Sequence, residues 1–199
     1  MSRKDEDVEK MLLLLAGTVL GWVLNTAREF WIRSREEKKE LAFISVKIGV
    51  MLDKLTSECA HIVLNVDNEK AHLDQNGRFK FDKETPNLCF HGLEIDWRVM
   101  DAKLTYELLR LESDLEISMK SLNDIFIEIK DSAEGRDFNS NRLGGILGEE
   151  RVYRLSIIGR ESYRLSEKVK KLSGISESDQ NRDDELRILE SYPRKSSHK

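Results

Sequence analysis

Three runs of apolar residues, spaced three and four positions apart, predict three long amphipathic helices. They lie between Leu41 and Val66, between Trp97 and Ile129, and between Val152 and Leu172. Apolar positions that repeat in this way share one face of an α-helix, and such a helix must pack against others to be stable. We therefore expect an all-α fold in which residues 34–173 form an antiparallel three-helix, coiled-coil-like bundle.

A continuous apolar segment precedes the first stripe. The 17 residues from Met11 to Ala27 carry no charge, and Leu14, Trp22 and Leu24 are among the bulky ones. As a helix the segment spans about 25 Å, near the lower limit for crossing a hydrocarbon core of about 30 Å. From Met11 to Leu24 it is apolar on every side, unlike the one-sided stripes. The pattern predicts a single transmembrane helix, and residues 1–33 form the tail, the anchor and its interfacial flank.

The residues after this segment indicate its orientation. Arg28, Arg33 and Arg35 follow it, and Phe30 and Trp31 give an aromatic flank suited to a membrane interface. Five Lys and Arg residues lie at positions 28–39, against three before the segment. Because an excess of Lys and Arg marks the cytoplasmic side, we expect the N-terminus outside and the bundle in the cytoplasm.

Two other interpretations of the apolar segment stay open. A buried core helix of this kind would have to be surrounded on all sides, whereas the other helices have stripes of their own to bury. A cleaved signal peptide would have a leader that is as acidic as it is basic and a poor cleavage site at Asn25-Thr26-Ala27. A membrane anchor accounts better for a segment that is apolar on every side and is not followed by a good cleavage site.

A motif for self-association lies inside the predicted span. Gly17 and Gly21 form a Gly-x-x-x-Gly pattern, and Asn25 continues the same helix face. Small residues let two helix backbones approach closely, and an Asn amide can form hydrogen bonds across the contact. We expect these three residues to form a seam between two copies of the chain.

The connections and the C-terminus are polar. Residues 67–95 contain Gln75-Asn76-Gly77-Arg78, which could form a tight hairpin, but we expect a plain loop. Asp96 is a candidate N-cap for the second bundle helix, and Gly174 suits the position just after the third. We expect residues 174–199 to be a flexible polar tail, although Leu186 and Leu189 could form a helical turn that docks on a partner.

The composition and the motifs disfavour several function classes. Lys and Arg total 33 against 37 Asp and Glu, a net charge of −4, so a nucleic-acid partner is not expected. The sequence has no Gly-rich phosphate loop after a strand and no Gly-x-Ser-x-Gly pattern. We expect no enzyme activity and no cofactor.

Two kinds of metal-binding pattern occur, and neither predicts a site. Glu58–His61 and Glu69–His72 match Glu-x-x-His, but di-iron bundles need these motifs on separate helices together with two further Glu residues. Cys59–His61 and Cys89–His91 together offer two Cys and two His for zinc. Residues two apart on a helix point to nearly opposite sides, so Cys59 and His61 cannot share an ion there.

The sequence as a whole predicts a single-pass, membrane-anchored scaffold or adaptor. Its partners would be the lipid bilayer, a second copy of itself and an unidentified protein. One alternative is a membrane-acting effector whose oligomerised anchor helices perturb the bilayer. A second alternative is a soluble helical-bundle metalloprotein, which requires the anchor prediction to be wrong.

Overall fold

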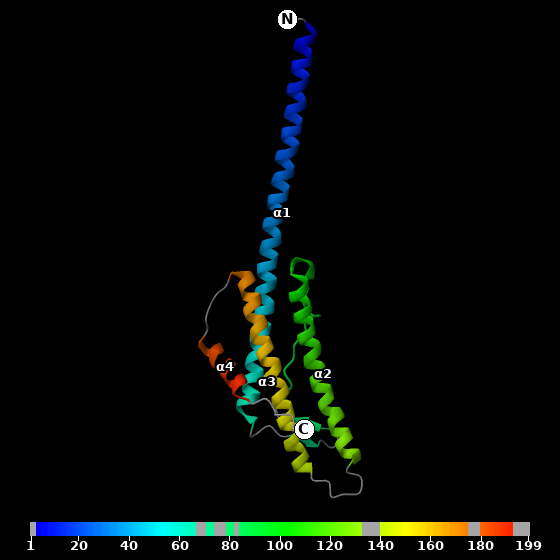
Figure 1. Cartoon of the computed structure of the whole chain (residues 1–199), viewed down its shortest axis with the longest axis vertical. Coiled ribbons are helices and arrows are strands. Elements are labelled where there is room, and N and C mark those ends of the chain that lie inside the picture. The colour runs from blue at the N-terminus through cyan, green and yellow to red at the C-terminus, as the bar shows by residue number, and fades with distance from the viewer. Residues whose placement is uncertain are drawn as a thin grey trace, which may run out of the picture. The chain divides into compact units, whose positions relative to one another are not determined.

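A computed structural model of the chain describes residues 3–66, 71–73, 79–81, 84–132, 140–174 and 180–192. It divides into two units, Met1–Leu41 and Ala42–Lys199. Helix α1 (Arg3–Leu64) forms the first unit and continues into the second, which also holds the remaining elements (Figure 1). These are strands β1 (Ala71–Leu73) and β2 (Phe79–Phe81), the 3-10 helix η2 (Trp97–Val99), and helices α2 (Ala102–Ser132), α3 (Ser140–Ser173) and α4 (Gln180–Ser191). The all-α prediction is confirmed.

The helices of the second unit do not alternate in direction as predicted. Helix α3 is antiparallel to α1, because Ser162 Oγ donates to the carbonyl of Leu52 at 2.8 Å while Ser166 Oγ contacts the carbonyl of Gly49. It is also antiparallel to α2: Arg154 reaches the carbonyl of Ser118, and Arg164, further along α3, reaches Glu107, which is earlier in α2. Helices α1 and α2 therefore run in the same direction (Figure 1). The expectation of a wholly antiparallel bundle was wrong for this pair.

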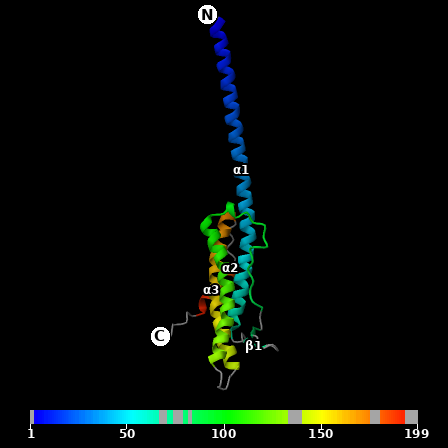
Figure 2. The same ribbon diagram turned by 90° about the vertical axis from the view of Figure 1, so that its right-hand side faces the viewer.

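The parallel pair is possible because the connection between α1 and α2 returns along the bundle (Figure 2). Its apolar side chains Leu88 and Phe90 are buried, and Phe90 packs edge-on against Trp97 with ring centroids 5.9 Å apart. The guanidinium of Arg151, fully buried on α3, donates to the carbonyl of Glu84 at 3.1 Å. These contacts fix the connection against the helices, so it is not the plain loop that we expected.

The predicted stripes form the core of the bundle. Ile48, Leu108 and Val152, one from each stripe, are fully buried, and most other stripe residues are nearly so. Strands β1 and β2 add a short antiparallel pair in which Ala71 faces Phe81, and the turn between them lies outside the described residues. Ala71 packs with Phe126 in a small cluster that also includes Leu143 and Leu147 of α3.

The C-terminal residues differ from the predicted flexible tail. Residues 180–191 form α4, and Leu189 is fully buried against α3. Arg182 of α4 is nearly buried and bridges Asp53 of α1 at 2.8 Å and Glu167 of α3 at 2.7 Å. The polar composition suggested a solvated tail, whereas the Arg182 side chain forms ion pairs with carboxylates of the bundle.

The helix ends agree with the predictions in part. Gly174 follows α3 with a φ of 74°, the left-handed conformation that glycine adopts readily at this position. Asp96 caps η2, through a hydrogen bond from the Arg98 amide at 3.0 Å, and not α2. The cap of α2 is Asp101, whose carboxylate accepts from the amides of residues 103 and 104.

Candidate functional site

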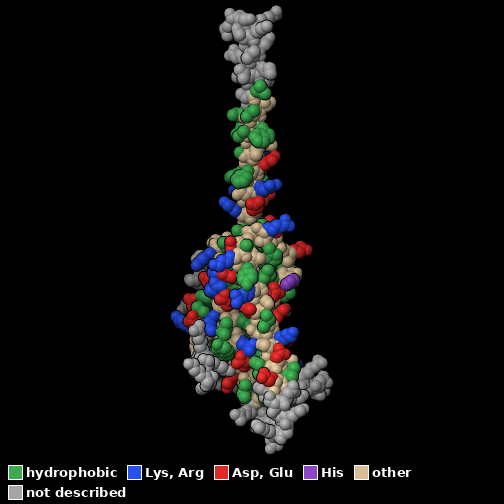
Figure 3. All heavy atoms as spheres, turned by 45° about the vertical axis from the view of Figure 1, so that its right-hand side comes forward, with side chains coloured by type: hydrophobic (Ala, Val, Ile, Leu, Met, Phe, Trp, Pro, Cys, Tyr) green, Lys and Arg blue, Asp and Glu red, His purple; other side chains and the backbone are tan. Residues whose placement is uncertain are grey.

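The residues predicted to cross a membrane lie on α1 in the first unit. Trp22 and Leu24 are 70% and 63% exposed, and Ala27 is exposed as well. Figure 3 shows hydrophobic side chains gathered along this part of the helix. The side chains of Met11 and Leu14 lie outside the part that the structure describes. No described helix has a stretch both long and apolar enough to cross a membrane, so the predicted span is not supported.

The exposed apolar residues of this stretch cover a wide arc of the helix. Successive residues turn by about 100°, so the bulky side chains from Leu15 to Leu24 cover about 200° of the circumference. They are Leu15, Val19, Leu20, Trp22, Val23 and Leu24, each between 49% and 70% exposed. The remaining arc carries small or polar residues: Gly17, Thr18, Gly21 and Asn25. The helix surface is thus divided into a bulky apolar arc and a small-residue arc.

The small-residue arc is open in the described structure. A Cβ atom added to Gly17 or to Gly21 would meet no described atom within 4 Å. The amide nitrogen of Asn25 donates to Glu29 Oε1 at 3.0 Å along the same helix. A second helix could therefore approach the two glycines closely, while the Asn25 amide keeps capacity for further hydrogen bonds.

The flank after the apolar stretch combines rings and cations. Phe30 and Trp31 are 75% and 62% exposed. The guanidinium of Arg35 lies over the Trp31 ring, 5.0 Å from its centroid. Arg28 and Arg33 are exposed on the same helix. A cation placed over an exposed indole gives this flank an amphipathic character.

The second unit also exposes apolar side chains on α1. Phe43 and Val50 are 69% and 62% exposed, and Val46 between them is 39% exposed. Their spacing of three and four residues places them on one helix face. We call these three residues the α1 stripe; it is a surface on which another protein could pack.

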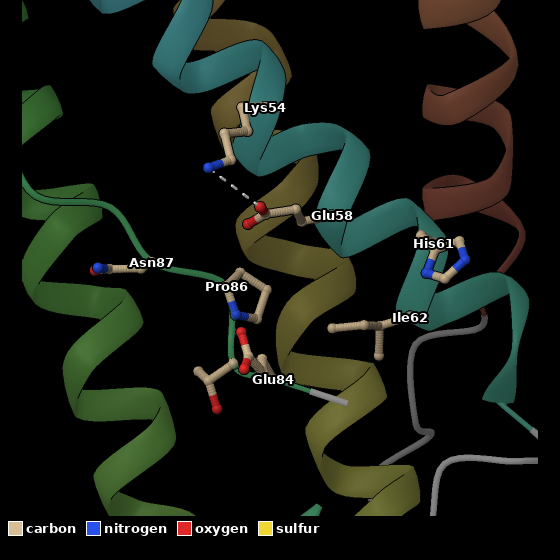
Figure 4. Close-up of a pocket in the computed structure, with 8 residues that line it drawn as sticks. Lys54, Glu58, His61, Ile62, Glu84, Pro86 and Asn87 are labelled. Carbon is tan, nitrogen blue, oxygen red and sulfur yellow. Dashed lines mark ion pairs between the residues drawn. The ribbon is translucent and has the colours of Figure 1, made fainter. Parts of the chain in front are cut away.

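A polar groove lies where the end of α1 meets the connection (Figure 4). It has a volume of about 410 Å³ and is lined by Lys54, Glu58, His61, Ile62, Glu84, Thr85, Pro86 and Asn87. Lys54 pairs with Glu58 at 3.7 Å, and their side chains are 75% and 38% exposed. These exposures show that the groove is open on the surface and is not an enclosed cavity.

The two Cys-x-His pairs have different surroundings. Cys59 is fully buried, and burial raises the pKa of its thiol far above the ordinary value, whereas His61 is exposed. Cys89 and His91 are both exposed and lie beside the carboxylate of Glu112 on α2. Among the described residues, these three form the group whose donor atoms could share a metal ion. The Glu69–His72 pattern falls partly outside the described residues.

Sequence reasoning missed Glu112, because the residue lies 21 positions from His91 and belongs to no local motif. Its position beside the predicted core stripe of α2, one residue after Leu111, was the available signal. A charged residue next to a core position has to find a polar partner when it is buried.

Comparison with known proteins finds no matching family, no matching curated protein and no matching solved structure.

Proposed function

We propose that the chain is a membrane-anchored scaffold. In this proposal the apolar part of α1 enters a bilayer, the small-residue arc joins two copies, and the bundle binds another protein through the α1 stripe. The observation that supports it best is the bulky apolar arc, whose side chains are exposed to water over residues 15–24. Fully burying one such side chain is worth about 1.5–3 kcal/mol, so this surface has a strong tendency to leave water.

The width of the arc favours lipid as its main cover. A helix that packs on one partner needs only a narrow stripe of apolar residues. An arc of about 200° is wider than one helix can cover, given the roughly 100° face of an ordinary amphipathic helix. Lipid tails can cover all of it at once. The Arg and Trp residues that follow resemble the flanks of membrane helices, which place their cations and rings at the interface.

The small-residue arc favours a second copy of the chain within the membrane. Lipid tails offer no hydrophobic drive for two helices to associate, so close packing at glycines and interhelical hydrogen bonds supply it. Gly17 and Gly21 provide room for close packing, and Asn25 provides the polar group. The excess of cations after the segment places the bundle on the cytoplasmic side of the membrane in this proposal.

The anchor is tested by fractionation of the full-length protein. We expect it to sediment with membranes and to resist carbonate extraction. Replacing both Leu20 and Leu24 with Arg should move it to the soluble fraction, because each Arg near the centre of a span costs about 2.5–3.5 kcal/mol. Thermal unfolding of the bundle, followed by circular dichroism, should stay unchanged. Wild-type protein found in the soluble fraction without detergent would refute the anchor.

The seam is tested by cross-linking in native membranes. The Gly17→Leu, Gly21→Leu double variant adds bulk where the backbones should meet, so we expect dimer bands to be lost while insertion is kept. The matched control is Val19→Leu, Val23→Leu, which adds bulk on the bulky arc and should leave the dimer intact. Dimers that persist in the glycine variant contradict the seam, and their loss in Phe43→Ser would assign self-association to the α1 stripe instead.

A further inference from the structure

The connection between α1 and α2 brings three potential metal ligands together. The Cys89 thiol, a ring nitrogen of His91 and a carboxylate oxygen of Glu112 all lie within 4.8 Å of one another. His91 Nδ1 is 3.2 Å from Glu112 Oε1. Two of these residues come from the connection and the third comes from α2, so the group links two elements of the bundle.

The local backbone explains why Cys89 and His91 face the same way. Leu88 and Phe90 are buried, whereas Cys89 and His91 are exposed, an alternation with a period of two residues. The two buried residues anchor the chain to the bundle, and the two exposed residues between and after them are left on its outer side. The amide of Leu93 donates to the carbonyl of Phe90 at 3.1 Å and closes a turn that contains His91.

Glu112 is held in place beneath this turn. Its side chain is 9% exposed, and Oε1 accepts a hydrogen bond from the backbone amide of Phe90 at 3.3 Å. Since Phe90 is itself buried against Trp97, moving the carboxylate away would leave a buried backbone amide without its acceptor. A ligand oriented by a backbone hydrogen bond is a common feature of metal sites.

We propose that Cys89, His91 and Glu112 bind one Zn²⁺ ion. Thiolate sulfur, imidazole nitrogen and carboxylate oxygen are the ligands that zinc takes in proteins. Sulfur and nitrogen donors favour zinc over magnesium or calcium, which prefer oxygen alone.

The distances suit a tetrahedral site. With zinc–ligand bonds near 2.0 Å, two neighbouring N or O ligands of a tetrahedron lie about 3.3 Å apart. The observed separation of 3.2 Å between His91 Nδ1 and Glu112 Oε1 agrees with this value. Cys89 and the His91 ring are exposed and can rotate toward the ion, so binding requires no movement of the buried carboxylate. Three protein ligands leave a fourth position for water or for a donor from another molecule.

The proposal is tested by zinc titration of the full-length protein, with metal content measured by mass spectrometry after dialysis. We expect one equivalent of zinc per chain. Co²⁺ in place of zinc should show a thiolate-to-cobalt charge-transfer band. Cys89→Ser and His91→Asn should each weaken zinc affinity at least tenfold, and Cys89→Ser should also remove the charge-transfer band. Both side chains are exposed, so these variants should keep the wild-type circular dichroism spectrum.

The matched controls come from the other Cys-x-His pair on α1. Cys59→Ala and His61→Asn remove the same residue types at the same spacing, and zinc affinity should stay within twofold of wild type in both. The proposal is overturned if wild-type protein retains no zinc at micromolar concentrations. It is equally overturned if zinc binding survives Cys89→Ser and His91→Asn, or if the control variants lose it.

Discussion

Replacing Leu189 with Ala should release α4 from the bundle while the rest of the bundle stays folded. Leu189 is fully buried over Gly159, where a Cβ atom would lie 2.8 Å from Leu189 Cδ2 and 2.9 Å from Cys59 Cβ. Leu189 and Cys59 thus both lie close to the same point beside Gly159 of α3. A helix of 12 residues has little stability of its own, so α4 depends on this contact and on its ion pairs.

The size of the effect follows from burial. Truncating a buried Leu to Ala costs about 2–5 kcal/mol. Because 1.4 kcal/mol is a factor of ten, the population with α4 undocked should rise by roughly thirtyfold to a few thousandfold. Local opening of this kind needs less free energy than global unfolding. The undocked population should therefore change strongly, while the thermal midpoint of the bundle should fall by only a small amount.

The thiol of Cys59 gives a direct assay. It is fully buried in the docked state, and burial raises its pKa, so it should react with an alkylating reagent only after opening. Cys89 is exposed and serves as an internal reference in the same sample. In Leu189→Ala we expect the Cys59 rate to rise at least tenfold while the Cys89 rate is unchanged.

Two further variants sharpen this test. Gly159→Ala adds a methyl group that contacts Leu189 more closely than packing allows, so it should have the same direction of effect. Arg187→Ala is the control, because its exposed side chain pairs with Asp184 three residues earlier on the same helix. If the Cys59 rate stays at the wild-type value in Leu189→Ala while the thermal midpoint falls, α4 is a fixed part of the cooperative core and the reasoning is refuted.

Two other predictions concern stability. The hydrogen bond from Lys168 lowers the pKa of Glu107, so the pair stabilises the fold above the ordinary carboxyl pKa and is lost as the pH falls through the lowered value. Glu107→Gln should therefore be less stable than wild type at pH 7, by under about 1 kcal/mol, and the two urea-unfolding curves should converge in acid; a constant difference across pH would contradict this. Gly144→Ala should cost about 1–3 kcal/mol, because its Cβ would overlap the carbonyl oxygen of Ala71. Gly145→Ala is the control at the neighbouring position: the added Cβ would meet no described atom from outside its own helix within 4 Å, so the change should stabilise α3 by about 0.5–1 kcal/mol. Equal effects of the two changes in thermal unfolding would refute the close approach.

Helical periodicity predicted the core of the bundle but not the path of the chain. The spacing of Ile48, Leu108 and Val152 marked buried faces correctly, because burial follows from which face of a helix is apolar. The direction of α2 depended on the connection before it, where Leu88 and Phe90 are isolated apolar residues without helical spacing. Their burial shows that a few side chains are enough to hold a connection along the helices of a bundle. Such isolated residues produce no periodic pattern in the sequence, so the path of the connection could not be predicted from it.

Polar residues in the core explain the other errors. Arg182 looks like part of a hydrated tail in the sequence, yet it is nearly buried by pairing with Asp53, which lies on α1. The fully buried Arg151 lies over the ring of Phe81, 4.3 Å from its centroid. A charge is stable in the interior only when its partners surround it, and these partners come from distant parts of the chain. Composition therefore indicates a mobile segment where the tertiary structure holds a docked helix.

The two Cys-x-His pairs show how far a spacing determines chemistry. On α1, residues two apart are turned by about 200°, which separates the buried Cys59 from the exposed His61, as the sequence predicted. In the connection, which bends at Phe90, the same spacing leaves both Cys89 and His91 exposed and beside each other. The third donor, Glu112, comes from α2, and only the return path of the connection brings it within 3.2 Å of His91. The return path of the connection thus explains both why the prediction of an antiparallel bundle was wrong and how the proposed zinc site is formed. If zinc links Cys89 and His91 to Glu112, its removal should loosen the connection where Phe90 contacts Glu112.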